Sequence, residues 1–385
     1  MNKKIQFVNG DVDIKIFAFT SENDFDEYMC MFTVTNTKLT FNQQVTQLLE
    51  SYKKLTTQGY SKELPNLHQA EICFKRYYLS DISNQIDELK SITGQEDFPV
   101  SIVQQAPLKG CKICMWTYMM TNIQKEQISK NTYMISHHGY DEIWTTQNTA
   151  EGANSYIQTK KIFKEYAKTL RKHKCTLAND CIRTWLYVND IDNQYAGVVK
   201  ARNEVFDEEG LTENTHYIAS TGIGGRDTCS DIYCKLNALS IRGLNPNQKH
   251  HLYALDYLNR TSEYGVRFER GTYIDYCQRR KVFISGTASI DHQGNILHIG
   301  DIKGQVNRML ENINALLHEA QCNFNDIAEM TVYLRDIADY TVVKEMLIEK
   351  LPDTPLIIVH APVCRPGWLI ESECLALKNI SLVSR

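Results

Sequence analysis

One pattern of segments occurs three times along this chain, and that repetition constrains the fold more than any other feature. Each copy has an amphipathic stretch typical of a helix, then a strand-like run, a second helix and two closing strands. The first helices are expected at Phe41–Leu55, Ser155–Arg171 and Ile302–Ala320. The signals shared at equal spacing are Gln44, Gln158 and Gln305 in these helices, and Tyr78-x-x-Asp81, Tyr187-x-x-Asp190 and Tyr333-x-x-Asp336 at the strand ends.

The repeats divide the chain into modules at residues 1–121, 122–250 and 251–385. Each module is predicted to be of the α/β (α+β) class, with one β-sheet and two helices packed on one face. Because 385 residues exceed a single ordinary core, several modules are expected on length alone.

Bulk composition excludes several classes of protein. A net charge of −4 provides no basic surface for nucleic acid, and no apolar run approaches the ~20 residues of a membrane span. The N-terminus lacks the apolar core of a signal peptide. Twelve cysteines are scattered without a disulfide framework, which predicts reduced thiols and a cytoplasmic protein.

The alternating run Trp368–Leu377 predicts a strand with two carboxylates on one face. A period of two places Glu371 and Glu373 together, and Arg365 lies just upstream. Carboxylates on an otherwise apolar strand are costly unless they have partners or a chemical task. The pattern therefore indicates an acid/base site for a small molecule. The alternative is a pair of structural carboxylates bound by Arg335 or Arg365.

The three copies differ at this strand. Aligning Leu375-Ala376-Leu377 with Asn237-Ala238-Leu239 places Tyr233 opposite Glu371 and Lys235 opposite Glu373. The corresponding strand of the first copy, Cys111–Met120, contains no carboxylate. We therefore expect one functional site per chain, in a cleft between the C-terminal and middle modules.

Several motifs together resemble the RidA/YjgF superfamily. They are Phe283-Ile284-Ser285-Gly286-Thr287-Ala288-Ser289-Ile290, the Gln305–Glu311 helix segment, Thr331-Val332-Tyr333-Leu334-Arg335-Asp336 and Leu369-Ile370-Glu371-Ser372-Glu373. Members are small α/β proteins that form trimers with sites in the clefts between subunits. The resemblance implies that three fused modules form a pseudo-trimer within one chain, so a monomer is expected, with further self-association left open.

A narrower resemblance, over residues 180–377, is to the chorismatases. It is carried by Arg183-Thr184-Trp185-Leu186-Tyr187-Val188-Asn189-Asp190-Ile191, Lys200-Ala201-Arg202-Asn203, Ser220-Thr221-Gly222-Ile223-Gly224-Gly225, Tyr264-Gly265, Phe268-Glu269-Arg270 and Cys364-Arg365. These enzymes hydrolyse chorismate to pyruvate plus a dihydroxycyclohexadiene carboxylate or a hydroxybenzoate.

The chorismatase resemblance implies a role for Glu371 as general acid, a small anionic metabolite as partner, and neither cofactor nor metal. It implies that Arg270 and Arg365 bind the substrate carboxylates. The other residues expected around the substrate are Cys364, Tyr264, Thr221, Gly222, Gly286, Thr287, Ala288, Glu373 and Arg335. Glu269 departs from the family pattern, in which smaller neutral residues are expected beside the arginine.

Two other functions stay open. The first is a Rid-type deaminase acting on enamines or imines, whose arginine on the strand corresponding to Pro355–His360 is missing here. The second is a non-catalytic metabolite-binding protein, of the kind that carries an endoribonuclease L-PSP or translation initiation inhibitor label.

Two further segments are expected as loops that face the substrate, and two other motifs are expected to be structural. Ser220–Gly225 is expected as a loop between two strands. A dinucleotide-binding motif lies between a strand and a helix, so this position argues against such a site. Gly286–Ser289 is expected as a loop after a strand at Lys281–Ser285. The CxxC at Cys111 and Cys114 is placed on a strand with its thiols on opposite faces, and no metal is expected there. His137-His138 and His250-His251 are expected at the surface or in turns.

Overall fold

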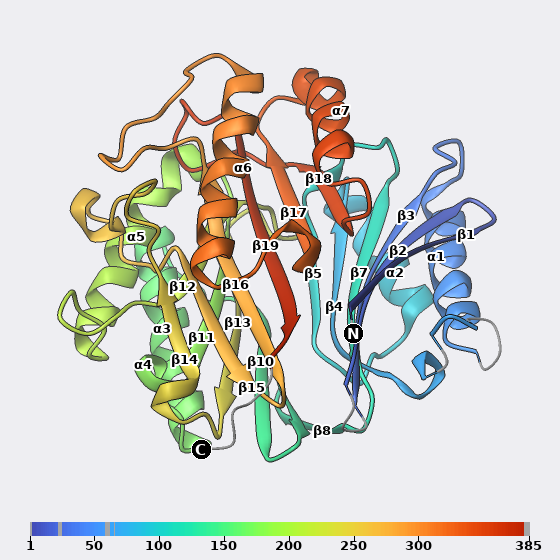
Figure 1. Ribbon diagram of the computed structural model, residues 1–385, viewed down its shortest axis with the longest axis horizontal. Helices are drawn as coiled ribbons and strands as arrows, with labels where there is room; N and C mark the ends of the chain where they lie inside the picture. Colours follow the sequence, from blue (N-terminus) through green and yellow to red (C-terminus); the bar gives the residue numbers. More distant parts are fainter. Residues whose placement is uncertain (1, 22–24, 58–61, 65, 381–385) are drawn as a thin grey trace.

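The computed structural model describes residues 2–21, 25–57, 62–64 and 66–380 and contains three β-sheets (Figure 1). The first sheet has the order β1-β2-β3-β7-β4-β5. Its strands are β1 (Asn2–Asn9), β2 (Val12–Thr20), β3 (Asp26–Val34), β7 (Ile113–Met120), β4 (Glu71–Leu79) and β5 (Val100–Gln104). Its helices are α1 (Phe41–Leu55) and α2 (Ile82–Thr93).

The second sheet has the order β12-β11-β13-β10-β9-β8. Its strands are β12 (Ala219–Gly224), β11 (Cys181–Val188), β13 (Cys234–Arg242), β10 (Tyr140–Asn148), β9 (Thr132–His137) and β8 (Gln124–Ser129). Its helices are α3 (Ser155–Lys172), the short α4 (Leu177–Asp180) and α5 (Ile191–Glu208).

The third sheet has the order β14-β15-β16-β19-β17-β18-β6. Its strands are β14 (Lys249–Leu252), β15 (Gly271–Tyr276), β16 (Arg279–Ala288), β19 (Ile370–Asn379), β17 (Ile327–Leu334), β18 (Leu356–His360) and, from the first module, β6 (Ala106–Pro107). Its helices are α6 (Ile302–Glu319) and α7 (Tyr340–Lys350). Short 3-10 turns are η1 (Leu67–Gln69), η2 (Pro246–Gln248), η3 (Thr261–Tyr264), η4 (Phe324–Asp326) and η5 (Ile337–Asp339).

The three sheets share one topology, which confirms the expected pseudo-trimer of tandem α+β modules. In every sheet the first three strands of the module form an antiparallel meander, and the third of them pairs with the last strand of the module. That last strand also pairs with β4, β11 or β17, respectively. On its other side, each of these strands pairs in parallel with β5, β12 or β18. Even the bulge recurs, near the start of β4, β11 and β17. The first 120 residues thus form a module equivalent to the other two.

The shared glutamines explain why the repeats keep their spacing. Gln44, Gln158 and Gln305 each stand fourth in α1, α3 and α6. Each side-chain oxygen accepts a hydrogen bond from a backbone N–H just before the last strand of the module, at Lys112, Tyr233 and Leu369 respectively. Each side-chain amide also donates to backbone carbonyls. One buried glutamine per module therefore satisfies backbone groups that would otherwise be orphaned.

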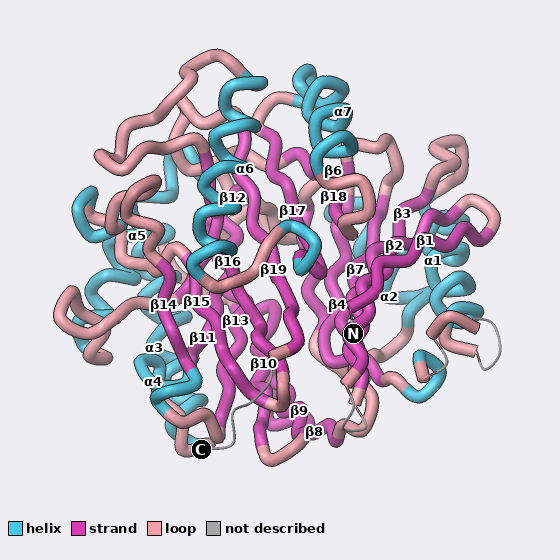
Figure 2. Tube along the Cα trace, in the orientation of Figure 1, coloured by secondary structure: helices cyan, strands magenta, loops and turns pink. Residues whose placement is uncertain are grey.

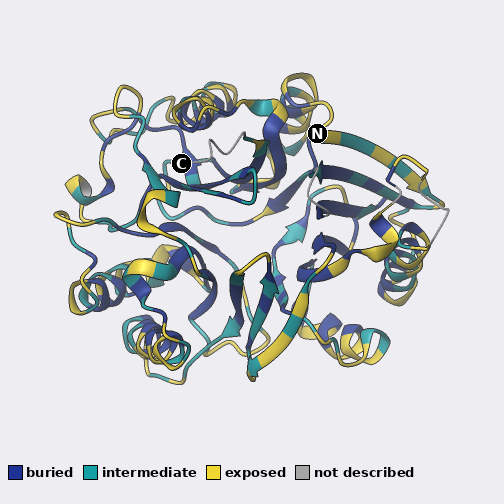
Figure 3. Ribbon diagram, turned by 60° about the horizontal axis from the view of Figure 1, so that its bottom comes forward, coloured by how far each residue is buried: buried dark blue, intermediate teal, exposed yellow. Residues whose placement is uncertain are grey.

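Burial follows the layers expected of such modules. The helices lie on the outside with one exposed face each, and the sheets meet in the middle of the molecule (Figures 2 and 3). Tyr78, Tyr187 and Tyr333 are the penultimate residues of β4, β11 and β17 and are at most 1% exposed. They occupy equivalent strand positions, as predicted.

The strand register corrects the alignment of the modules by two residues. Tyr78, Tyr187 and Tyr333 pair with Cys114, Lys235 and Glu371, respectively. Lys235 is therefore equivalent to Glu371, and Asn237 to Glu373. The alignment from sequence was wrong because it matched the hydrophobic residues of the two strands. The helix glutamines give the correct alignment, because Gln158 binds the backbone N–H of Tyr233 and Gln305 binds that of Leu369. Tyr233 and Leu369 are therefore equivalent.

Four local expectations are also corrected. Ser220–Gly224 belongs to strand β12, and residues 286–288 belong to β16, which contains a bulge between Ile284 and Thr287. Cys111 precedes β7, so its Sγ lies 3.3 Å from that of Cys114 rather than on the opposite face. His137 is buried, and His250 and His251 lie in β14.

The division into modules at 121/122 and 250/251 remains a proposal. The second boundary would cut β14, so we propose placing it before Lys249. In the part of the chain that the structure describes, no helix combines the length and the apolar character needed to cross a membrane.

Candidate active site

A cavity lies between the edge strand β12 of the middle module and strands β16 and β19 of the C-terminal module. α5 and the segment before β15 close its sides. The residues that line it are Tyr195, Arg202, Ser220, Gly222, Val266, Phe268, Arg270, Gly286, Ala288, Ile290, Cys364, Arg365, Trp368 and Glu371.

Glu371 provides the acid of this cavity. It is the second residue of β19, only 4% exposed, and pairs across the sheet with Ala288 and Tyr333. The bulge in β16 shifts the register beside it, as bulges near sites commonly do. A Cβ atom at Gly286 would lie 2.1 Å from Oε1 of Glu371, so a larger residue here would displace this carboxyl.

The surroundings of Glu371 favour its neutral form. Burial is the main cause and the nearby Glu373 the second, and together they raise the pKa of Glu371 to about 8. The positive charges of Arg270 and Arg183 act in the opposite direction. Glu371 therefore carries a proton at neutral pH and can donate it.

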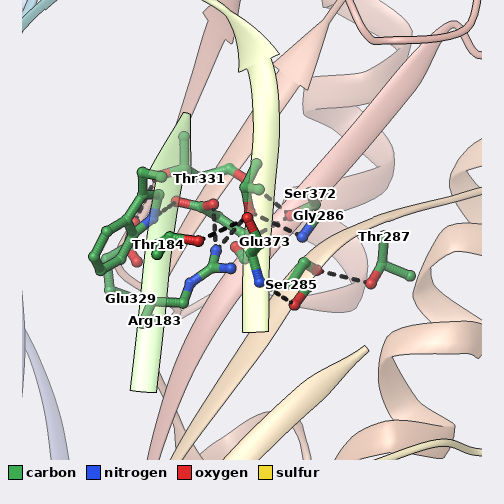
Figure 4. Close-up of polar contacts among 12 residues, drawn as sticks. Arg183, Thr184, Ser285, Gly286, Thr287, Glu329, Thr331, Ser372 and Glu373 are labelled. Atoms are coloured by element: carbon green, nitrogen blue, oxygen red, sulfur yellow. Dashed lines mark hydrogen bonds and ion pairs between the residues drawn. The ribbon is translucent and has the colours of Figure 1, made fainter. Parts of the chain in front are cut away.

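Glu373, two residues further along β19, has a different environment and stays outside the cavity lining. Its carboxylate accepts a hydrogen bond from Arg183 Nη2 at 2.7 Å (Figure 4). It accepts a second one from Trp185 Nε1 at 2.8 Å. Arg76 Nη1 from the first module lies 3.6 Å from it. These partners make Glu373 a structural residue where three modules meet.

A chain of polar contacts connects this structural pair to the cavity. Arg183 Nη2 also donates to Thr221 Oγ1 at 2.5 Å, and the backbone N–H of Gly286 donates to the same oxygen at 2.9 Å. Thr221 thereby holds β12 against the bulge that supports Glu371.

Three arginines from different segments reach the cavity. Arg270 is 4% exposed, and its guanidinium donates to the side-chain and backbone oxygens of Asn259. Arg365 lies over the ring of Trp368, 4.7 Å from its centroid, and donates to the carbonyl of Gly294. Arg202, from α5, is 1% exposed. With a neutral Glu371, the lining carries excess positive charge and suits an anion.

The cavity has a volume of about 40 Å³ in this structure, which is room for little more than water. A ring-sized ligand can enter only if lining side chains or the adjoining loops move. Arg365 lies on such a segment, between β18 and β19.

The expected site residues divide into two groups. Besides Glu371, the cavity lining includes Arg270, Arg365, Cys364, Gly222, Gly286 and Ala288. Thr221, Thr287, Glu373 and Arg335 do not line it. Thr287 donates to the carbonyl of Ser285, and Arg335 binds Asp192 and the carbonyl of Val363. The side chain of Tyr264 lies outside what the structure describes.

Sequence reasoning gave no role to several lining residues, of which Arg202 matters most. It belongs to a motif that carried the chorismatase resemblance, and an arginine about two turns after Tyr195 on α5 was the available signal. Glu269, the departure from that family, does not line the cavity. Its carboxylate accepts a hydrogen bond from the Tyr217 N–H at 2.7 Å.

The two equivalent clefts have no carboxyl at the position of Glu371. Cys114 replaces Glu371 in a cavity of about 340 Å³ between the first and third modules, which is also lined by Ile357 and Ile358 of β18. In the third cleft Lys235 donates to Asp227 and the carbonyl of Ile102. A glutamate at this strand position therefore occurs in one of the three clefts.

Comparison with known proteins agrees with this architecture. Residues 268–378 match the family described as endoribonuclease L-PSP. A RutC family protein of Pyrococcus abyssi is 36% identical over 100 residues, which cover 26% of this chain and 79% of that protein. The 3-aminoacrylate deaminase RutC of Acinetobacter baylyi is 29% identical over 97 residues, covering 25% of this chain and 77% of the deaminase.

The chain belongs to the RutC family, within the RidA/YjgF superfamily. A solved chorismatase superimposes with a TM-score of 0.63 at 18% identity, covering 79% of this chain and 92% of the chorismatase. This likeness shows a chorismatase-like fold across the modules. The RutC protein of Acinetobacter baylyi is named as a deaminase and the solved neighbour as a chorismatase, and both are enzymes.

Proposed function

We propose that the chain is an enzyme that hydrolyses chorismate, or a close analogue, without a cofactor. The observation that carries the proposal is a buried carboxyl, Glu371, with a pKa near 8 in a cavity lined by three arginines. Such a site combines a proton donor active at neutral pH with cations for a dianionic substrate. The chorismatase-like fold supports the same assignment.

The reaction requires a proton at the enol ether of the enolpyruvyl group. Glu371 donates its proton to the methylene carbon, and positive charge develops on the ether-bearing carbon. Water adds to that carbon and loses a proton to the Glu371 carboxylate, which restores the acid. The hemiketal then collapses to pyruvate and a ring alcohol, so that one water is consumed and the carboxyl is regenerated.

The arginines would bind the two substrate carboxylates. A guanidinium pairs with a carboxylate through two parallel hydrogen bonds, which fixes orientation as well as charge. A hydrogen bond to Asn259 fixes the guanidinium of Arg270. The ring of Trp368 and the carbonyl of Gly294 fix that of Arg365. Both side chains therefore have defined positions in the cavity. Arg202 supplies a third cation to the same lining.

The direct test is incubation of the purified chain with chorismate. A coupled assay for pyruvate and chromatography of the ring product should show both products in equal amounts. Absence of pyruvate at high enzyme concentration, with a folded protein, would refute the proposal.

Deamination is the second candidate, favoured by the similarity to the 3-aminoacrylate deaminase. The strand that faces Glu371 is β12, Ala219-Ser220-Thr221-Gly222-Ile223-Gly224, rather than the Pro355–His360 segment considered from sequence. Like that segment it contains no arginine. Ammonium release from an enamine substrate, without pyruvate release from chorismate, would favour the deaminase.

The pH dependence of the proposed reaction follows from the pKa of Glu371. The acid must be protonated to act, so kcat/KM should be level below about pH 8 and fall above it. The decline should approach about tenfold per pH unit, as for loss of one essential proton. A pH profile of pyruvate release measures this. An activity that rises through pH 8 would assign Glu371 to the role of a base.

Lysine substitutions test the arginines. Arg270→Lys and Arg365→Lys keep the charge and lose the bidentate geometry, so KM should rise more than kcat falls. Steady-state kinetics with chorismate separates the two constants. Arg335→Lys, outside the cavity and paired with Asp192, is the matched control and should leave both constants near wild type. Unchanged KM in both cavity variants would remove these arginines from substrate binding.

A further inference from the structure

Three potential metal ligands lie together where two hairpin turns of different modules meet. His137 ends β9 and His138 follows it in the turn to β10, while Cys277 lies in the turn between β15 and β16. One ligand atom from each of His137, His138 and Cys277 lies within 4.8 Å of the others. We propose that these residues bind one divalent transition-metal ion of the zinc class.

The environment of His137 points to a missing ligand. Its side chain is 1% exposed, and neither ring nitrogen has a hydrogen-bond partner among the described residues. Nε2 lies 3.7 Å from Oε1 of Glu142, outside hydrogen-bond range, and Nδ1 has no such neighbour. A buried imidazole without a hydrogen bond is costly, whereas a metal on one nitrogen and a carboxylate beside the other is a common arrangement.

The other two ligands come from turns with defined backbones. His138 and Cys277 both have a φ of 50°, in the left-handed region that residues with a side chain seldom adopt. The His138 ring lies 4.7 Å from the Phe25 ring, and Tyr276 lies 5.9 Å from the His137 ring. These aromatic neighbours pack around the turns.

The donor set identifies the class of ion. Two imidazoles and one thiol suit zinc and similar borderline ions, and they disfavour magnesium and calcium, which prefer oxygen. The buried charged residues next to the site neutralise one another, because the carboxylates of Glu27 and Glu142 form ion pairs with Arg279 and Lys281. His138 is exposed, so water can supply a fourth ligand.

The position assigns a structural role to the ion. Cys277 lies two residues before Arg279, which pairs with Asn379 at the C-terminal end of β19. Glu371 pairs with Ala288 near the N-terminal end of β19, so the metal ligands and the acid lie at opposite ends of this strand. A metal here would connect the middle and C-terminal modules remote from the proposed chemistry. The inference is independent of the proposed function.

The test is titration of the full chain, treated with a chelator and kept reduced, with Co²⁺ and then Zn²⁺. We expect one cobalt per chain, a thiolate-to-cobalt absorption band, displacement by zinc and a higher Tm with metal. Cys277→Ser should abolish the band and weaken zinc binding more than about 100-fold, the upper end for loss of an outer-shell partner. His138→Asn should weaken binding similarly.

Cys229→Ser is the matched control, because Cys229 is exposed and lies outside the cluster. It should retain the wild-type spectrum and affinity. Absence of a thiolate band, or equal binding by the Cys277→Ser and wild-type chains, would overturn the proposal. Because both test positions lie in turns and are not fully buried, a folded variant is expected and circular dichroism checks it.

Discussion

Replacing Glu371 by glutamine is expected to lower kcat for pyruvate release by roughly 10²–10⁴ while the chain stays folded. Glutamine keeps the shape and hydrogen-bonding capacity of the protonated acid, and it loses the proton to be transferred. Because Glu371 is neutral at pH 7, the substitution removes no buried charge. The measurement is a coupled pyruvate assay at saturating chorismate.

Glu329→Gln is the matched control for this variant. Glu329 is also a buried carboxyl with a raised pKa, about 7, and burial is the main cause. It lies on β17, accepts a hydrogen bond from Thr331 Oγ1 and does not line the cavity. Near-wild-type pyruvate release by Glu371→Gln, or an equal loss in Glu329→Gln, would contradict the role of Glu371 as proton donor.

Replacing Glu373 by alanine is expected to reduce the free energy of unfolding by about 3–5 kcal/mol, the usual effect of breaking a buried ion pair. The variant would leave Arg183 and Arg76 buried without their carboxylate and would remove the acceptor of Trp185 Nε1. Urea unfolding followed by tryptophan fluorescence reports the change.

Glu311→Ala provides the comparison, because this exposed side chain forms a surface ion pair with Arg308. Its effect should stay within about 0.5 kcal/mol. Glu373→Ala should also move the alkaline limit of any activity to lower pH, because Glu373 helps to raise the pKa of Glu371. A larger loss of turnover in a folded Glu373 variant than in Glu371→Gln would reverse the roles of the two carboxylates.

Local sequence patterns were sufficient for the architecture of the modules. The spacing of Gln44, Gln158 and Gln305 predicted three equivalent helices, and α1, α3 and α6 lie at those positions within one residue. The alternating run at the C-terminus predicted β19 and its two carboxylates. Such patterns can be read from the chain because helix and strand periods arise from local backbone geometry.

The register between strands could not be predicted in the same way. Lys235 rather than Tyr233 is equivalent to Glu371, and the bulge in β16 determines what lies beside that carboxyl. A shift of this kind depends on cross-strand pairing and on side-chain hydrogen bonds from a distant helix. Neither leaves a signal within the strand itself.

The sequence by itself determined that three similar modules follow one another and that one of them carries an acidic strand. Only the tertiary structure decided that Glu371 faces a cavity with Arg202, Arg270 and Arg365, while Glu373 binds Arg183 and Arg76. These residues lie far apart along the chain and meet because three sheets pack together. The pKa of a carboxyl depends on that packing, since burial and neighbouring charges exist only in the folded molecule.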